Sequence, residues 1–206
     1  MLALFMKGGF LMYPILICSI ASLAIILERG YALWHLKKRG LIWELNQIKD
    51  LIRRHKLREA TKLALSAHEL LLKELGHFLS NCSQRTAMEK ALAHEGQKEL
   101  REAERHLPFL ASIANISPLL GLLGTVTGMI KAFMVVQNMG NRVNAAMLAG
   151  GIWEAMLTTA FGLIVAIPSL IAYDYFMHKV NGYATSIEDT LNEILNLLEK
   201  QDFFKE

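Results

Sequence analysis

The chain has 206 residues, of which 53% are hydrophobic and only 20% are charged. Because a soluble domain carries about 25% charged residues, this composition favours a membrane protein over a soluble enzyme. The net charge of +3 is small, and basic residues alternate with acidic ones, so we expect no nucleic-acid partner. The two cysteines lack paired or metal-ligand spacing, so we expect no disulfide framework.

Three apolar stretches are long enough to cross a lipid bilayer, which takes about 20 helical residues. They cover residues 10–27, 107–130 and 146–173. The first exceeds the apolar core of a signal peptide and ends at Glu28 without a small-residue cleavage site, so we interpret it as a retained span. The predicted fold class is an all-α polytopic membrane protein with three transmembrane helices, from which long helices extend into a cytoplasmic helical bundle.

The distribution of Lys and Arg predicts the orientation of the chain, because these residues accumulate on the cytoplasmic side. They are frequent from Arg29 onward, whereas the opposite side carries Lys7 and Arg142, with Lys131 near the membrane edge. We therefore expect a periplasmic N-terminus and a cytoplasmic C-terminus. The predicted segments are an N-terminal segment with the first span (1–28), a cytoplasmic helical domain (29–106), the second span (107–135), a short periplasmic loop (136–145), the third span (146–174) and a cytoplasmic helix (175–206).

The predicted cytoplasmic segments read as helical, with apolar residues at spacings of three and four. The tail has one apolar stripe, made of Val180, Tyr183, Ile187, Leu191, Ile194, Leu195 and Leu198. Within 29–106 we expect helix breaks at Gly40, Gly76, 81–83 and Gly96. The simplest assembly lets the second and third spans continue as helices into the cytoplasm, where they bundle with the helices of 29–106.

Small residues recur every three or four positions in the second and third spans. The stripes are Ser117, Gly121, Gly124, Thr125, Gly128 and Ala132, then Ala155, Thr159, Gly162, Ala166 and Ser169. Such stripes let helix backbones approach closely, so one interpretation is a packing seam. The other is a narrow polar path lined by Thr125 and Thr159. Pro118 and Pro168 are predicted to kink the two helices, since each removes a backbone hydrogen bond.

Glu154 is the only acidic residue between Val143 and Tyr173. A carboxylate at the centre of a membrane helix costs roughly 2.5–3.5 kcal/mol, so it is interpreted as functional by default. The alternative is a carboxylate near the helix end that snorkels to water. Thr158, four residues on, shares its face, and the candidate ion-pathway residues are Thr125, Glu154, Thr158 and Thr159. Lys131 either pairs with Glu154 or snorkels as well.

Catalytic and cofactor constellations are missing from the sequence. The seven histidines are dispersed, with no ligand spacing that predicts a metal. The glycines of 121–128 are not followed by the Lys-Ser/Thr of a phosphate loop. We therefore expect no enzyme, no cofactor and no metal, and any work must draw on an ion gradient or a partner.

Two motifs resemble the ExbB/TolQ/MotA family of proton-channel motor proteins: ISPLLGLLGTVTGMI at 116–130 and GIWEAMLTTAFGLIVAIP at 151–168. The chain resembles ExbB most, and TolQ next. The order of its predicted spans also resembles the layout of the family. The fourth span and longer loop of MotA are missing, so a flagellar stator is not expected.

The resemblance implies a homopentameric ring in the bacterial inner membrane, with two copies of an ExbD/TolR-type single-span protein in its pore. Proton passage would drive a TonB/TolA-type protein. By motif position, Thr125 and Thr159 match the pore threonines, and Glu154 matches the glutamate of the third span. Thr127 and Thr158 are hydroxyl residues that the family pattern does not require.

Three functions remain open from the sequence. The first is an ExbB-like motor subunit that energises outer-membrane transport, and the second is a TolQ-like subunit for envelope maintenance. The third is a non-conducting membrane scaffold. The driving ion is expected to be the proton, with sodium as the alternative because Thr158 and Thr159 provide adjacent hydroxyls.

Overall fold

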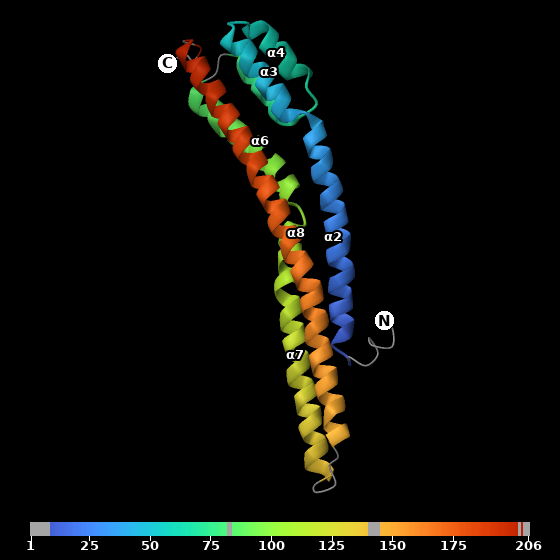
Figure 1. Cartoon of the computed structure of the whole chain (residues 1–206). Coiled ribbons are helices and arrows are strands. Elements are labelled where there is room, and N and C mark those ends of the chain that lie inside the picture. Colours follow the sequence, from blue (N-terminus) through green and yellow to red (C-terminus); the bar gives the residue numbers. More distant parts are fainter. Residues whose placement is uncertain (1–8, 82–83, 140–144, 202, 204–206) are drawn as a thin grey trace. The chain divides into compact units, whose positions relative to one another are not determined.

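A computed structural model describes residues 9–81, 84–139, 145–201 and 203. Lys7, Cys82, Arg142 and positions 140–144 of the predicted periplasmic loop lie outside the described residues. The described residues form helices and short connections without a β-strand, which confirms the predicted all-α class. The helices are α2 (Met12–Arg39), α3 (Leu41–Arg53), α4 (Leu57–Ser66), α5 (Leu70–Asn81), α6 (Arg85–Glu104), α7 (Leu107–Met139) and α8 (Ala145–Lys200) (Figure 1).

Three of these helices are long and apolar enough to cross a membrane, as predicted. The candidate spans are Met12–Leu33, Leu107–Asn138 and Ala149–Lys200. The helix α8 has 56 residues, which at 1.5 Å per residue is about 84 Å of helix. A hydrocarbon core is only about 30 Å thick. Much of α8 must therefore lie outside the bilayer, in agreement with the expected continuation of the third span.

The second span does not continue in the same way, so that part of the expectation is wrong. α6 ends at Glu104 and α7 begins at Leu107. Between them His106 has a φ of 66°, which belongs to the left-handed region that side chains other than glycine rarely adopt. A residue in this conformation cannot continue an α-helix, so α6 and α7 are separate helices.

The expected breaks at Gly76 and Gly96 are also wrong, because these residues lie inside α5 and α6. A single glycine costs a helix only about 1 kcal/mol relative to alanine, which packing easily exceeds. At Gly76 the missing side chain is used: a Cβ there would lie 2.9 Å from Cγ of Leu65 in α4. The expected break at Gly40 is present, with a φ of 79°.

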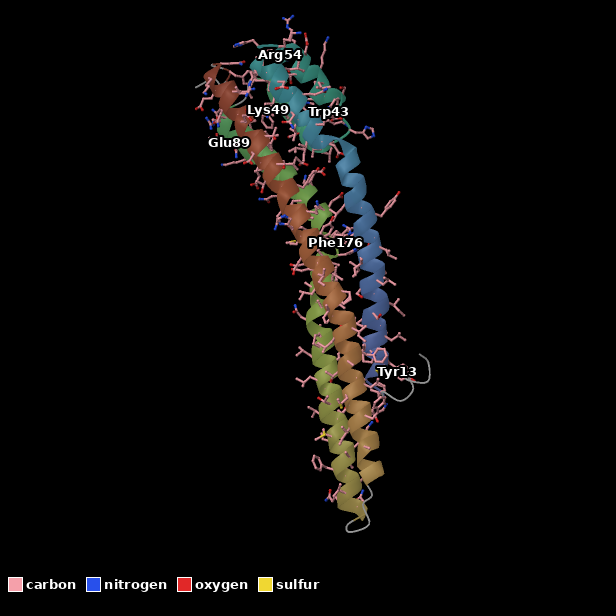
Figure 2. All side chains as sticks on the ribbon, in the orientation of Figure 1. Tyr13, Trp43, Lys49, Arg54, Glu89 and Phe176 are labelled. Atoms are coloured by element: carbon pink, nitrogen blue, oxygen red, sulfur yellow. The ribbon has the colours of Figure 1, made fainter. Side chains whose placement is uncertain are left out.

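The chain divides into two compact units, Met1–Gly30 with His106–Phe176, and Tyr31–Arg105 with Met177–Glu206. The first contains the apolar part of α2, all of α7 and the first part of α8. Its outer surface carries many large apolar side chains, which suits a lipid environment (Figure 2). Gly30 of α2 lies beside the ring of Phe176, whose Cζ would be in ordinary contact with an added Cβ at 3.9 Å.

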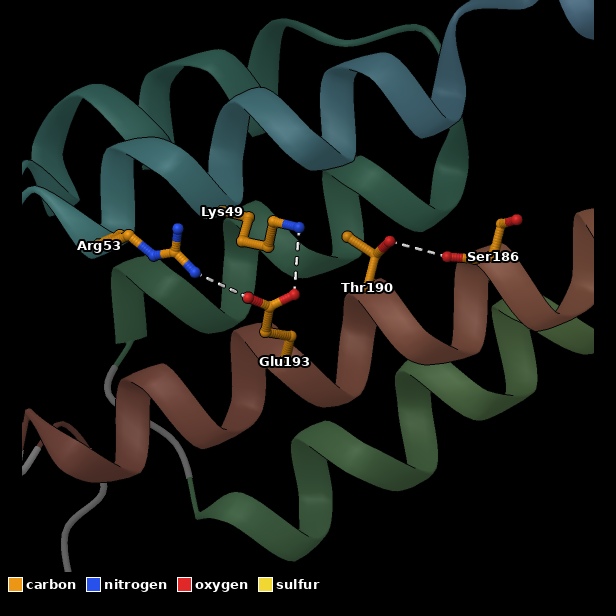
Figure 3. Close-up of polar contacts among 5 residues, drawn as sticks. All are labelled: Lys49, Arg53, Ser186, Thr190 and Glu193. Carbon is orange, nitrogen blue, oxygen red and sulfur yellow. Dashed lines mark hydrogen bonds and ion pairs between the residues drawn. The ribbon is translucent and has the colours of Figure 1, made fainter.

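The second unit has a hydrophobic core formed by α3 to α6 and the last part of α8. Ile48, Leu72 and Ile194 have no exposed surface, and the tail stripe predicted from the sequence supplies Ile187, Leu191, Ile194, Leu195 and Leu198 to this core. Above the core, Lys49 and Arg53 of α3 both donate to the carboxylate of Glu193, at 3.1 and 3.0 Å (Figure 3). The tail is thus bound to the helices that precede it mainly by buried apolar area.

Candidate ion pathway between helices α7 and α8

The helices α7 and α8 lie side by side (Figure 1), and glycines form their contact. A Cβ at Gly121 would lie 2.9 Å from Cα of Thr159, and one at Gly162 would lie 2.6 Å from the carbonyl oxygen of Ser117. Real Cβ atoms do not approach neighbours this closely, so the backbones are as near as glycine allows. The two small-residue stripes meet as one seam within a single chain.

The seam continues toward the connection between α7 and α8. A Cβ at Gly128 would lie 2.8 Å from Cβ of Ala155, and one at Gly151 would lie 3.0 Å from Cβ of Ala132. Sequence reasoning began the stripe of the third span at Ala155 and missed Gly151. The signal was available, since Gly151 precedes Ala155 by four residues and therefore lies on the same helix face.

Thr158 and Thr159 both face α7, but they do so differently. Thr158 is 1% exposed, its methyl group would lie 2.5 Å from a Cβ at Gly124, and its hydroxyl donates to the carbonyl oxygen of Glu154 at 2.7 Å. The hydroxyl of Thr159 donates across the seam to the carbonyl oxygen of Gly121 at 2.9 Å. Thr159 therefore places a polar interaction between two otherwise apolar helices.

Thr125 is only partly buried, and its hydroxyl donates to the carbonyl oxygen of Leu122 in its own helix at 2.7 Å. Thr127 likewise donates to Gly124 of its own helix at 3.1 Å. The seam glycine Gly124 directly precedes Thr125, so Thr125 lies beside the contact with α8. The hydroxyls of Thr125 and Thr159 thus have separate acceptors, the carbonyl oxygens of Leu122 and Gly121.

Glu154 forms an ion pair between the two helices. Its Oε1 accepts a hydrogen bond from Nζ of Lys131 in α7 at 2.7 Å, which is the pairing that the sequence left open against simple snorkelling. The Glu154 side chain is 26% exposed and that of Lys131 is 58% exposed. Gly9, just before α2, lies against the same carboxylate, since a Cβ at Gly9 would overlap Oε1 of Glu154. Sequence reasoning missed this contact, because Gly9 and Glu154 are distant in the chain.

Pro118 and Pro168 lie inside α7 and α8, which remain continuous helices. Each is next to a fully buried serine, Ser117 or Ser169. The hydroxyls of these serines donate to carbonyl oxygens four residues back, those of Ile113 and Val165, at 2.7 Å. The hydroxyls of Ser117 and Ser169 are therefore hydrogen-bonded within their own helices, as an apolar surrounding requires.

The polar side chains between α7 and α8 are few, and they lie along the seam. Among the described residues, His, Cys, Asp and Glu side chains form no group of three that could hold a metal. What the first unit offers instead is a charged pair and a set of hydroxyls on two closely packed apolar helices. These features define a polytopic membrane protein with a few polar groups between its apolar spans.

Comparison with known sequences agrees with this class. The sequence model of the MotA/TolQ/ExbB proton channel family matches residues 44–189, which is more than half of the chain. The chain belongs to the MotA/TolQ/ExbB proton channel family. The match begins within α3, continues through α4 to α6, and includes α7, the seam and Glu154.

Individual relatives carry ExbB and TolQ names. The chain is 36% identical over 182 residues to a putative biopolymer transport protein ExbB-like 1 from Synechocystis, covering 82% of this chain and 67% of that one. It is 28% identical over 200 residues to biopolymer transport protein ExbB from Pseudomonas putida, covering 92% and 59%. It is 37% identical over 108 residues to the Tol-Pal system protein TolQ from Haemophilus influenzae, covering 52% and 47%. The aligned region thus spans between about half and two thirds of these relatives.

Proposed function

We propose that this chain is an ExbB-like subunit of a proton-driven motor in the bacterial inner membrane. The observation that carries the proposal is the α7/α8 seam, where Thr159 and the Lys131–Glu154 pair supply the few polar side-chain interactions between two apolar helices. A charge inside a membrane helix is expensive and therefore usually functional. In this proposal Glu154 sets the electrostatic field near the outer mouth of the pore, and Thr125 and Thr159 line the path.

The proposed complex is a homopentamer that holds two copies of an ExbD/TolR-type single-span protein. The N-terminus faces the periplasm, and residues 29–106 and 175–206 face the cytoplasm. One charge moving through the membrane potential releases about 2.3 kcal/mol per 100 mV, which is enough to bias a rotation step. The work would be transferred to a TonB-type protein for outer-membrane transport. Neither a catalytic step nor a cofactor is part of this proposal.

A TolQ-like role is the second candidate, favoured by the 37% identity to a protein named for the Tol-Pal system. The two roles predict different phenotypes for deletion of the chain. Loss of energised uptake with an intact envelope supports the ExbB-like role, whereas leakage of periplasmic proteins and chained cells support the TolQ-like role.

The composition of the complex tests the motor proposal directly. The chain would be purified gently from its native membranes and weighed as an intact complex. Five copies with two copies of a small single-span protein that has an aspartate in its span are expected. A ring with another number of subunits, or one without such a partner under any extraction condition, would contradict the proposed assembly.

Substitution at Thr159 separates a motor from a non-conducting scaffold. Thr159→Val keeps the shape but removes the hydroxyl, Thr159→Ser keeps the hydroxyl, and Thr158→Val removes a neighbouring hydroxyl that donates within its own helix. In vesicles, a motor is expected to lose proton flux in Thr159→Val and to keep most of it in Thr159→Ser. A non-conducting scaffold would show no proton flux in the wild type or in any of the three variants. Replacing protons by sodium in the same assay identifies the driving ion.

A further inference from the structure

The carboxylate of Glu154 on α8 meets two other segments of the first unit. Lys131 of α7 donates to Oε1 at 2.7 Å, and Gly9, before α2, lies against the same oxygen. The backbone carbonyl of Glu154 accepts the hydroxyl of Thr158. The acidic side chain that the proposed function places near the pore mouth is therefore already occupied by a cation that belongs to the chain itself.

We propose that Lys131 is a positioning residue that acts as a tethered cation, competing with the transported cation for the carboxylate of Glu154. This inference rests on the proposed function and adds to it a specific control of access to Glu154. A cation that approaches Oε1 of Glu154 must displace the Lys131 ammonium group.

The geometry of Lys131 suits reversible displacement. Its side chain is 58% exposed, and a lysine is a point charge on a flexible stem with four carbons. It can leave the carboxylate without moving α7. Half-exposed ion pairs are weak, worth about 0.2–1 kcal/mol, so the competition changes occupancy by a modest factor and does not block the site.

Gly9 supplies the space that this arrangement needs. Its φ of 73° belongs to the left-handed region, and an added Cβ would overlap Oε1 of Glu154. A side chain at this position would push the carboxylate away from its present location. Gly9 thus leaves the carboxylate room at its present position, where Lys131 pairs with it.

The first test measures how accessible the carboxylate is to protons. Dicyclohexylcarbodiimide adds to protonated carboxyl groups, and labelling of Glu154 can be followed by peptide mass spectrometry in the full-length chain with its co-purified partners. In Lys131→Gln the labelling rate is expected to rise about 1.5- to 5-fold, the factor that corresponds to a half-exposed pair. Lys131→Arg, which keeps the charge, is expected to label like the wild type.

A matched control is available in the second unit. Lys98 pairs with Glu95 at 2.5 Å, with a lysine side chain 51% exposed, so Lys98→Gln removes a similar ion pair far along the sequence. It is expected to leave Glu154 labelling unchanged. An unchanged labelling rate in Lys131→Gln would overturn the inference, as would an equal rise in Lys98→Gln.

The second test measures proton flux in vesicles made with the same complexes. Lys131→Gln is expected to raise passive flux by the same factor as labelling, and the double variant Lys131→Gln/Glu154→Gln is expected to match Glu154→Gln alone. A wild-type complex without flux would contradict the proposed function, while labelling would still decide the role of Lys131. If the wild type conducts protons and Lys131→Gln changes neither flux nor labelling, the proposed motor function is supported. The proposal that Lys131 is a tethered cation is then wrong.

Gly9→Ala tests whether the room left by Gly9 is needed for the present position of the Glu154 carboxylate. Gly40→Ala is its control. Both glycines have a positive φ, 73° and 79°, but nothing lies within 4 Å of an added Cβ at Gly40. Gly9→Ala is expected to change Glu154 labelling and Gly40→Ala is not. Equal effects of the two substitutions would show that backbone strain alone is responsible, and the role assigned to Gly9 would be wrong.

Discussion

The hydroxyl of Thr159 on α8 donates a hydrogen bond to the carbonyl oxygen of Gly121 on α7 at 2.9 Å. The bond is possible because Gly121 has no side chain: a Cβ there would lie 2.9 Å from Cα of Thr159. Gly121 on one helix and Thr159 on the other therefore act as a pair. The close approach of the two backbones brings the carbonyl oxygen of Gly121 within reach of the Thr159 hydroxyl. This pair belongs both to the proposed ion pathway and to the packing seam.

Thr159→Val is expected to lower stability only slightly while it abolishes flux. Hydrogen bonds between membrane helices average about 0.6 kcal/mol, so the loss of this bond shifts the midpoint of thermal unfolding little. Measuring the thermal unfolding midpoint in detergent and the proton flux in vesicles for the same variant tests whether flux is lost while stability is kept. A large loss of stability with proportional loss of flux would indicate a purely structural threonine.

Gly162→Ala is expected to destabilise the first unit by about 1–3 kcal/mol, the usual range for overpacking. An added Cβ would lie 2.6 Å from the carbonyl oxygen of Ser117, which belongs to a helix backbone that cannot easily move. Gly150→Ala is the matched control, because nothing lies within 4 Å of a Cβ there and alanine favours a helix by up to about 1 kcal/mol. Thermal unfolding of both variants in detergent measures the difference; equal midpoints would argue against a tight seam.

In the second unit, Ile194→Ala is expected to destabilise far more than Glu193→Gln, although Glu193 forms two ion pairs. Ile194 has no exposed surface, and such truncations cost about 2–5 kcal/mol. Glu193 is 43% exposed, and pairs of this kind contribute about 0–1 kcal/mol each. Denaturant unfolding of the full chain at low and high salt compares the two. A larger effect for Glu193→Gln would mean that charge, and not apolar burial, holds the tail to α3.

Replacing His55 and His106 by glycine is expected to have different effects, although both have a positive φ, 56° and 66°. Glycine relieves roughly 1 kcal/mol of left-handed backbone strain at each. His106 in addition contacts the carboxylate of Glu28 through Nδ1 at 2.8 Å, and that interaction is lost. The unfolding midpoint of His55→Gly is therefore expected to be higher than that of His106→Gly. The reverse order would mean that the contact with Glu28 does not stabilise the chain.

Much of the fold could be predicted from the sequence because helix-forming and membrane-spanning tendencies are local properties. The apolar stretch of 107–130 and the tail stripe that includes Ile194 are features of length and periodicity. They depend on the hydrophobic effect acting on one helix at a time. The breaks at Gly76 and Gly96 were predicted wrongly for a related reason, because tertiary packing overrides a small local preference.

The sequence by itself determined that three helices enter a membrane, that two of them carry small-residue stripes and that Glu154 is exceptional. Only the tertiary structure decided that the stripes face one another, that Thr159 bonds to Gly121, and that Lys131 and Gly9 meet the Glu154 carboxylate. The reason is physical: a residue's helix face follows from its own spacing, but its partner follows from the rotation and register of two helices, which depend on every contact along their seam at once.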